Sequence, residues 1–276
     1  MAGELNIIHW AGQNVGSAEK RRNTADPLDA FHFHKMMDIA KYMTFSQSNG
    51  FVGENQRFAD LIIIGEGKRT FFNANCSVAH VVEGINEQSR ARYVCDFISL
   101  RGEGRKEEFL CVAYNKGAVY APSSSVTDRG NGDRGFARIA VRTRKFPGRV
   151  FHIDVCHIEN NPIRRAGIKE SSFLARRLHE RFSYPPPDLL VGDTNIPWLK
   201  FTSDPFVREL QFANRDEFPS TTIFRGKFSK TPPVDRAFVS KGRENRARGR
   251  YFRLEDFSEH EEKFSNHVCL CIQLDR

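Results

Sequence analysis

The chain has 276 residues, of which 39% are hydrophobic and 28% are charged, so it can bury a sizeable core in one large domain or two small ones. Its formal net charge of +8 and sequence pI of about 9.3 favour polyanionic partners such as nucleic acid, phosphoinositide head groups or an acidic membrane surface. An ordinary basic soluble protein is the alternative. The longest apolar run is too short to cross a bilayer, which excludes a transmembrane helix.

Cysteine usage and the first residues of the chain indicate the compartment. The six cysteines include no Cys-x-x-Cys pair, and most of them lie in apolar runs, where a free thiol behaves as a small buried hydrophobe. This pattern favours a reducing compartment over a disulfide scaffold. Because no cationic stretch followed by an apolar one opens the chain, we expect a soluble intracellular protein, cytoplasmic or nuclear, with leaderless export left open.

Three elements are predicted in the first quarter of the chain. Residues 5–10 form a short apolar run that is typical of a strand. Asp26 and Pro27 suit the N-cap and the first helical position, and apolar residues at spacings of three and four continue this helix to residue 43. Residues 61–64 form a continuous aliphatic run, typical of a strand that is buried on both faces.

Antiparallel pairs are predicted in the middle of the chain. Residues 94–100 and 109–114 flank a Gly-rich polar turn, which predicts a hairpin. Residues 123–133 are polar and Gly-rich, so we expect a loop there. Residues 136–142 and 149–155 are expected to be strands on either side of a Pro-Gly turn.

The last third of the chain continues the mixed order. Residues 171–182 have apolar side chains four apart and predict a helix, and residues 189–191, 234–239 and 267–274 predict strands. Helical crossovers therefore alternate with hairpins. We predict a single α/β domain that spans residues 1–276 and is built as a sandwich.

Several predicted strands carry polar side chains at one end. Glu66 and His157 end apolar runs, Asp193 and Asn195 follow another, and His267 begins the last strand. Strand ends are where α/β enzymes collect functional groups, and carboxylates with histidines serve metal-assisted attack on phosphate esters. Each residue alone is more often structural, as an exposed carboxylate, an Asx-turn or a packed histidine. The ordered set carries the functional prediction.

In their order and separation along the chain, these strand ends and their polar residues resemble the sequence motifs of the endonuclease/exonuclease/phosphatase superfamily, which has the deoxyribonuclease I-like fold. The matching phrases are residues 60–66, residues 150–157, Gly192-Asp193-Thr194-Asn195, Asp235 with its apolar neighbours, and Ser265-Asn266-His267. The resemblance spans essentially the whole chain. It implies a four-layer α/β sandwich of two packed mixed β-sheets flanked by helices. It also implies divalent-metal hydrolysis of phosphodiesters or phosphomonoesters.

The resemblance implies a site for Mg²⁺ or Mn²⁺ as cofactor. Glu66 would anchor the cation. The family usually has an aromatic-Asn pair at the end of its first strand, whereas this chain has Ala11, so Gln13 or Asn14 would substitute for the amide. Asn266 stands where the family has aspartate, and an uncharged amide oxygen is a weaker ligand for a hard cation than a carboxylate.

The resemblance and the chemistry of the side chains also assign catalytic roles. Asp193 would orient or deprotonate the attacking water, and Asn195 would hold that water and a phosphate oxygen. Asp235 would hydrogen-bond one nitrogen of His267, fixing the ring and favouring imidazolium. His267 would then stabilise charge on the phosphoryl group or protonate the leaving oxygen, and His157 would be a second phosphate contact or acid.

Five further residues are candidates for contact with nucleic acid. Arg138 would line a phosphate groove and Trp198 would stack on a base or sugar, although core packing is the alternative for the tryptophan. Arg246, Arg248 and Arg250 alternate within the basic run 241–250, where an extended loop would present all three on one side. A solvated loop is the alternative for that run.

The sequence therefore predicts a Mg²⁺-dependent phosphodiester hydrolase, a nuclease that acts on DNA or RNA by in-line attack of an activated water. Its charge favours a long polyanion, which would be bound through counterion release. Two alternatives stay open. The first is a phosphoinositide phosphatase with the same core. The second, suggested by Ala11 and Asn266, is a catalytically weakened, nucleic-acid-binding member of the fold.

Overall fold

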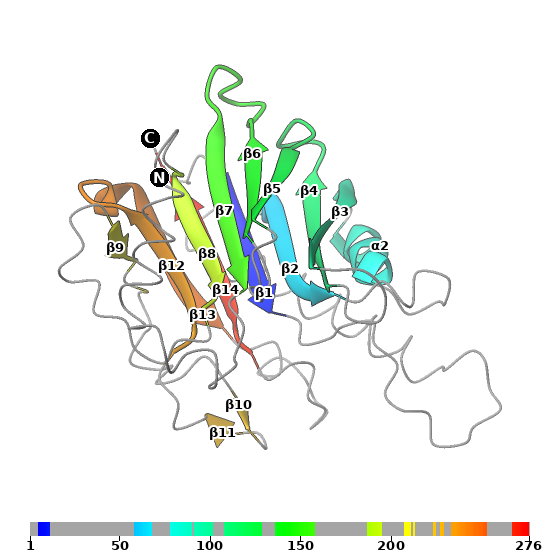
Figure 1. The fold of residues 1–276 in the computed structure, drawn as a ribbon. Coiled ribbons are helices and arrows are strands. Elements are labelled where there is room, and N and C mark those ends of the chain that lie inside the picture. Colours follow the sequence, from blue (N-terminus) through cyan, green and yellow to red (C-terminus); the bar gives the residue numbers. More distant parts are fainter. Residues whose placement is uncertain are drawn as a thin grey trace.

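The computed structural model describes the segments that form the centre of the fold. These are residues 5–11, 58–67, 78–89, 91–101, 108–128, 136–157, 187–194, 207–210, 212, 223–224, 227–228, 233–252 and 267–275. Within them the chain forms strands, one α-helix, α2 (Val78–Ser89), and one 3-10 helix, η5 (Glu244–Arg246) (Figure 1).

The strands are short to medium in length and lie along the whole chain. Their bounds are β1 (Leu5–Ala11), β2 (Leu61–Gly67), β3 (Tyr93–Arg101), β4 (Glu108–Asn115), β5 (Ser123–Asp128), β6 (Phe136–Val141), β7 (Phe151–His157), β8 (Leu189–Asp193), β9 (Val207–Glu209), β10 (Ile223–Phe224), β11 (Lys227–Phe228), β12 (Asp235–Ser240), β13 (Ala247–Phe252) and β14 (Cys269–Leu274).

Two six-stranded sheets contain all of these strands except β10 and β11, which form a separate pair. The first sheet has the order β13-β14-β1-β2-β4-β3, and the second has the order β5-β6-β7-β8-β12-β9. In each sheet the central pair is parallel, β1 with β2 and β7 with β8, and the other pairs are antiparallel. This arrangement confirms the predicted pair of mixed sheets.

Side-chain alternation explains why the sheets pack face to face. Leu5 and Ile7 of β1 point into a core shared with β7 and β8, which contribute Ile153 and Val191. Strands β1 and β8 pack against one another across this core. Each sheet therefore buries one apolar face against the other, and the core lies between them.

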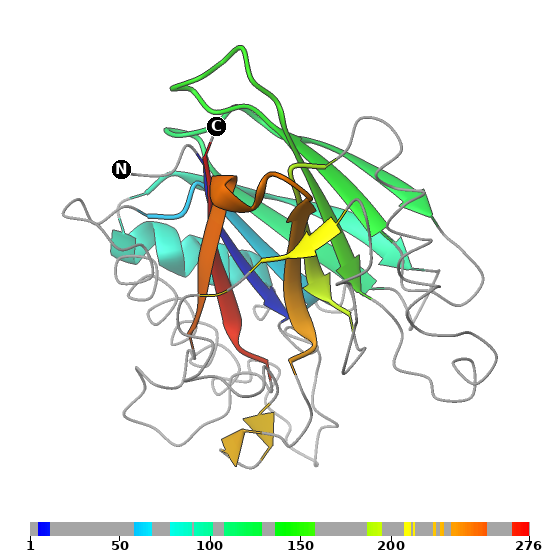
Figure 2. The ribbon, with the colours of Figure 1, turned by 90° about the vertical axis from the view of Figure 1, so that its left-hand side faces the viewer.

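The outer face of the first sheet is covered by α2. Ile8 and Trp10 of β1 lie in a second apolar cluster with Val82 and Ile85 of the helix. Figure 2 shows the helix on the outer side of the first sheet. The helix α2 was not predicted from the sequence. The predicted helices at residues 26–43 and 171–182 lie outside the described residues, so the remaining flanking layer and the one-domain extent stay predictions.

Two segments expected to be loops contain strands at sheet edges. β5 lies within residues 123–133 and pairs with β6, and the basic run 241–250 contains η5 and most of β13, which pairs with β14. An edge strand is paired on one side only and can expose polar side chains, so these segments lack an apolar run. Within the described part of the chain, no helix has the length and apolar character needed to cross a membrane.

Candidate active site

Three polar side chains form a row across neighbouring strands of the second sheet. His157 ends β7 and lies opposite Asp193, which ends β8, and Asp193 lies opposite Asp235, which begins β12. Their predecessors on the same faces, such as Val155 and Val191, lie in the core between the sheets. The three side chains therefore continue the inner face of the sheet to its end, and all three are buried.

Gly192 allows β7 and β8 to approach closely beside this row. Its φ is 155°, and a Cβ atom built on it would lie 1.9 Å from the carbonyl oxygen of Cys156 on β7. From the sequence, a glycine at this strand end predicts a tight turn of the backbone. The strand instead continues through Asp193, so the glycine is required by contact with the neighbouring backbone.

Hydrogen bonds fix the spacing between the two aspartates. The backbone N–H and the hydroxyl of buried Thr194 both donate to the carbonyl oxygen of Val234, at 2.9 and 2.8 Å. The hydroxyl of Tyr251 donates to the carbonyl oxygen of Asp235 at 3.3 Å. The bonds of Thr194 join the end of β8 to the start of β12, and the bond of Tyr251 joins β13 of the first sheet to the start of β12. Neither Thr194 nor Tyr251 was predicted from the sequence to have this role.

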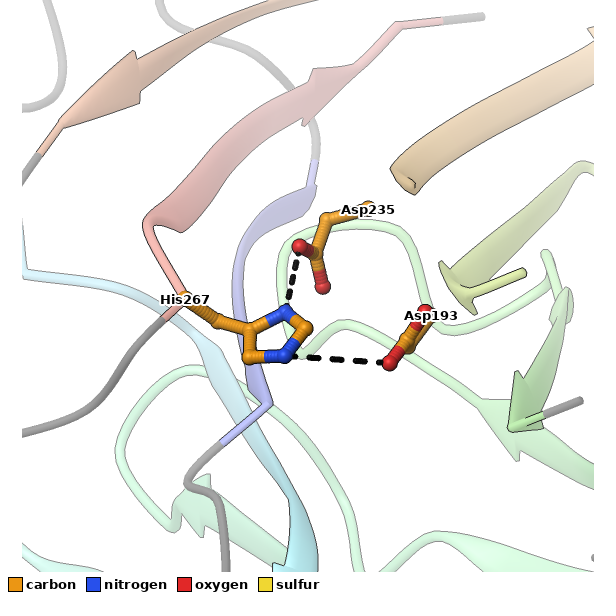
Figure 3. Close-up of side chains that lie close together, drawn as sticks. All are labelled: Asp193, Asp235 and His267. Atoms are coloured by element: carbon orange, nitrogen blue, oxygen red, sulfur yellow. Dashed lines mark hydrogen bonds and ion pairs between the residues drawn. The ribbon is translucent and has the colours of Figure 1, made fainter. Parts of the chain in front are cut away.

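His267 reaches the row from the first sheet, where it precedes β14. Its Nδ1 donates to Oδ2 of Asp235 at 2.7 Å, and its Nε2 lies 3.9 Å from Oδ2 of Asp193 (Figure 3). Nε2 of His157 lies 3.8 Å from the same Asp193 oxygen. Both longer distances exceed a direct hydrogen bond and suit a water or phosphate oxygen held between the groups.

His9 is a third histidine of this region, and it was not predicted from the sequence. It follows Leu5 and Ile7 on the inner face of β1, is buried, and its Nδ1 has no hydrogen-bond partner within the described residues. Burial lowers the pKa of His9 to about 4; the charge of Asp235 opposes this shift, and His267 adds to it. His9 is therefore a neutral imidazole close to the charged groups. Its position two residues after Ile7, near a strand end, is the signal that would have found it.

A divalent cation fits the donor set at this end of the sheets. One ligand atom from each of Asp193, Asp235 and His267 lies within 4.8 Å of the other two, and all three residues are buried. Carboxylate oxygens are the ligands preferred by Mg²⁺ and Mn²⁺, and imidazole is an accepted additional donor for transition metals. The donors come from both sheets, so a bound ion would lie where the two sheets meet.

The predicted metal ligands Glu66, Asn14 and Asn266 stay predictions. The two asparagines lie outside the described residues. Glu66 is near the end of β2 and Asp193 ends β8. Figure 1 shows the arrowheads of β2 and β8 pointing to the same end of the sandwich. Of the predicted catalytic residues, Asn195 also lies outside the described part of the chain, as does Trp198.

The predicted arginine contacts lie away from the row of catalytic candidates. Arg138 lies between the core residues Ala137 and Ile139 on β6, so it is on the outer face of the second sheet. There its Nε and one terminal nitrogen donate to the two carboxylate oxygens of Asp154, at 2.7 and 2.9 Å. This pairing holds the guanidinium against β7.

Arg246, Arg248 and Arg250 do not share an extended loop. Arg246 ends η5, whereas Arg248 and Arg250 lie on β13, on the face opposite to buried Tyr251. Ala247, the first residue of β13, pairs with Leu274, which in turn pairs with the first residue of β1. The candidate site lies toward the other end of β1. Contact of these arginines with nucleic acid stays a prediction.

Comparisons with known proteins show which solved structures share this fold. No protein-family model and no curated protein sequence matches the chain. Solved structures do match over nearly the full length. An endonuclease/exonuclease/phosphatase family protein from Bacteroides thetaiotaomicron is 14% identical, with a TM-score of 0.58 and coverage of 98% of this chain and 97% of that one.

Two further structures show the range of proteins with this fold. A mannosyl-6-phosphatase from Bacteroides thetaiotaomicron is 13% identical with a TM-score of 0.58, and covers 99% of this chain and 100% of its own. TDP2 from D. rerio, in complex with a single-strand DNA product, is 14% identical with a TM-score of 0.56, and covers 98% of each chain. The chain therefore has the fold of endonuclease/exonuclease/phosphatase proteins.

Proposed function

We propose that the chain is a divalent-metal-dependent hydrolase of phosphate esters and a member of the endonuclease/exonuclease/phosphatase superfamily. One observation carries the proposal. Oδ2 of Asp193 lies 3.8 and 3.9 Å from Nε2 of His157 and His267, at the buried end of a fold shared with such proteins. A carboxylate flanked by two imidazoles can hold both an attacking water and a phosphoryl oxygen.

Asp193 would be the base that orients the water for in-line attack. Its oxygen would accept a proton from a water held in the space beside the two rings. Asp235 accepts the Nδ1 hydrogen of His267 and so keeps Nε2 turned toward Asp193 (Figure 3). From there His267 would donate to the phosphoryl or leaving oxygen, and His157 would donate from β7. Asn195 would help to hold the water.

Asp193 and Asp235, with His267 or Glu66, would hold the cation. Nδ1 of His267 is hydrogen-bonded to Asp235, so where its Nε2 binds the cation, the donation to the phosphoryl oxygen would come from His157 alone. When bound, Mg²⁺ or Mn²⁺ supplies positive charge that offsets the charge of the phosphoryl oxygens. The carboxylates that bind the ion also set its position relative to the histidines. Because Asp235 already accepts a short hydrogen bond from His267, we assign it mainly to orienting that ring and assign Asp193 to both roles.

We further propose that the substrate is a phosphodiester of DNA or RNA, so that the enzyme is a nuclease. The net charge of +8 supports a polyanionic substrate, and a protein of the same fold binds a single-strand DNA product. A phosphomonoesterase, such as a phosphoinositide phosphatase, is the second candidate, because the mannosyl-6-phosphatase has a comparable TM-score. Both candidates would use the same groups.

One assay tests the function and separates the candidates. Purified protein is incubated with plasmid DNA, single-stranded RNA, inositol phosphates and mannose 6-phosphate, each with Mg²⁺, with Mn²⁺ and with EDTA. The Asp193→Asn variant is the matched control for contaminating enzymes. Metal-dependent cleavage of DNA or RNA that the variant lacks supports the nuclease, and phosphate release from the small esters supports the phosphatase. No metal-dependent hydrolysis of any substrate would contradict the proposal.

A further inference from the structure

The basic run 241–250 begins at the end of the sandwich that lies away from the candidate active site. Asp275, after β14, donates its backbone N–H to the carbonyl oxygen of Arg246 at 2.7 Å, and β14 ends opposite the first residue of β1. The candidate site lies near the last residues of β1. At the usual rise per residue of a strand, the two ends are roughly 20 Å apart.

Two other basic loops meet the 241–246 loop at this end. Residues 116–122 join β4 to β5, and residues 142–150 join β6 to β7 (Figure 1). We call these three loops the distal end. They contain eight cations and one carboxylate: Lys116, Arg142, Arg144, Lys145, Arg149, Lys241, Arg243 and Arg246, with Glu244 as the carboxylate.

Contacts between the loops make the distal end one continuous surface. Val119 forms a β-bridge with Thr143, and Nε of Arg144 donates to the carbonyl oxygen of Lys116 at 2.7 Å. Asp188, just before β8, then connects the second loop to the third, because its Oδ1 lies 3.5 Å from Arg149 and 3.1 Å from Arg243. The surface therefore crosses from one sheet to the other.

The nearby carboxylates Asp188, Glu244 and Asp275 are too few to neutralise the eight cations of this surface. Asp188 serves two guanidinium groups at once, and Glu244 lies 3.5 Å from Arg208 of β9. Arg142, Arg144 and Lys145 are all exposed. A cluster of exposed cationic side chains attracts polyanions, and each guanidinium group can bind a phosphate through two hydrogen bonds.

An aromatic side chain in the same surface narrows the choice among polyanionic partners. Tyr120 is 41% exposed, the one large apolar side chain so exposed among the described residues, and the guanidinium of Arg144 lies 4.6 Å from its ring centre. Stacked arginine and tyrosine offer flat surfaces to unpaired bases. An anionic membrane would instead favour several apolar side chains able to insert, and the distal end exposes only this one.

We propose that the distal end binds single-stranded nucleic acid, as a surface separate from the candidate active site. Phosphates contact the arginines and lysines of the three loops, and bases stack on Tyr120 and Arg144. A strand bound there is held by a second, non-catalytic contact. The proposal does not depend on hydrolysis and goes beyond the proposed function.

Binding is measured by fluorescence anisotropy with labelled poly-dT and poly-U strands of about 20 nucleotides, longer than the site of one small binding fold. EDTA is present, so catalysis does not contribute. In the test variant, Arg142→Gln, Arg144→Gln and Lys145→Gln are combined. Its control combines Arg142→Lys, Arg144→Lys and Lys145→Arg, which keep the charge. Circular dichroism and melting temperatures establish that both variants are folded.

The neutral variant should bind at least about tenfold more weakly, and the slope of log K against log salt should fall by about 0.7 for each lost phosphate contact. The charge-preserving control should keep the slope. Tyr120→Ala should weaken binding by about fivefold or more, whereas Tyr120→Phe should not. Replacing Tyr120 removes no cation but does remove the ring on which Arg144 stacks, so its effect reports the stacked pair.

Three results would overturn the proposal. They are an unchanged affinity and salt slope in the folded neutral variant, equal binding by both Tyr120 variants, and binding to phosphatidylserine-containing vesicles without binding to either strand. The last result would assign the surface to a membrane. Absence of phosphate-ester hydrolysis would contradict the proposed function and would leave this binding result unaffected, because the two measurements are made separately.

Discussion

Asp193 and His267 carry the proposed chemistry, so their replacement should separate activity from folding. Asp193→Asn removes the base and a metal ligand, and His267→Ala removes the ring that Asp235 holds. Each variant should lose about two to four orders of magnitude in turnover, because general acid–base and electrostatic roles have that size. The measurement is the hydrolysis rate at saturating Mg²⁺ or Mn²⁺.

The matched control is His152→Ala, which removes a histidine from the other end of the strand that carries His157. Its turnover should stay close to that of the unmodified protein. If either Asp193→Asn or His267→Ala retained near-normal turnover while remaining folded, the roles assigned above would be wrong.

His9 should make the stability of the protein depend on pH. Its pKa is about 4 when folded, against an ordinary value of 6.5, so the unfolded chain binds the proton more readily. The free energy of unfolding should therefore have its full value above pH 6.5 and decrease as the pH falls toward 4. The fall due to His9 should be on the order of 3 kcal/mol.

His9→Leu replaces the imidazole with an apolar side chain of similar size and so removes the proton-binding group. Urea unfolding of both proteins between pH 4 and 7.5 measures the effect, and the variant should show a smaller loss of stability in acid. At neutral pH it should be at least as stable, since a buried nitrogen without a hydrogen-bond partner is removed. Parallel stability curves for the two proteins would contradict the assignment.

At the scale of single elements, the contact between β7 and β8 depends on Gly192. Gly192→Ala would bring a Cβ within 1.9 Å of the Cys156 carbonyl oxygen, and backbone cannot move aside as a flexible side chain can. We expect a loss of about 3 kcal/mol or more in the free energy of unfolding. Gly148→Ala is the control, because nothing lies within 4 Å of its added Cβ. Equal urea midpoints for the two variants would refute this account of Gly192.

Central strands were predicted from the sequence because burial on both faces leaves a clear pattern. Residues 61–64 lie in central β2. The predicted hairpin is β3 with β4, and β3, although an edge strand, shows the same pattern because α2 packs on its outer face. β5 and β13 were missed because edge strands need no apolar outer face. In β13, small and aromatic side chains face inward and alternate with arginines that face outward. The many charges made this alternation hard to recognise as a strand pattern. The helix α2 was missed because its first turn has no acidic residue and its last turn no basic one.

The site was predictable where a polar residue ends an apolar strand. His157 and Asp193 follow that rule, and Asp235 and His267 were found through their place in the family pattern. Their distances were not predictable, because they depend on how two sheets pack and on hydrogen bonds to backbone atoms, such as those of Thr194. His9 was missed because its apolar neighbours indicate only a strand.

At the scale of the whole molecule, the candidate metal ligands come from both sheets. Asp193 and Asp235 belong to the second sheet, and His267 precedes β14 of the first. A cation bound to all three would connect the sheets directly, so binding should stabilise the folded protein against global unfolding. Apart from these ligands, the sheets are held together mainly by the apolar core between them.

Metal binding should therefore raise the melting temperature, and the two cations should differ. At a concentration one hundred times the dissociation constant, one bound ion adds about 2.7 kcal/mol, or several degrees for a chain of this size. Mn²⁺ should act at lower concentration than Mg²⁺, because it accepts mixed carboxylate and imidazole ligands more readily. Calorimetric titration of the unmodified protein and of His267→Ala measures this, and the variant should shift much less.

Asn266→Asp extends the same titration to the predicted ligand beside His267. If residue 266 also binds the ion, an added carboxylate should lower the metal concentration that gives half of the thermal shift and half of the maximal rate. An unchanged or higher requirement for metal would place Asn266 outside the metal shell. An equal shift in the unmodified protein and in His267→Ala would mean that His267 does not bind the ion, and Glu66 of β2 would then be the candidate ligand from the first sheet.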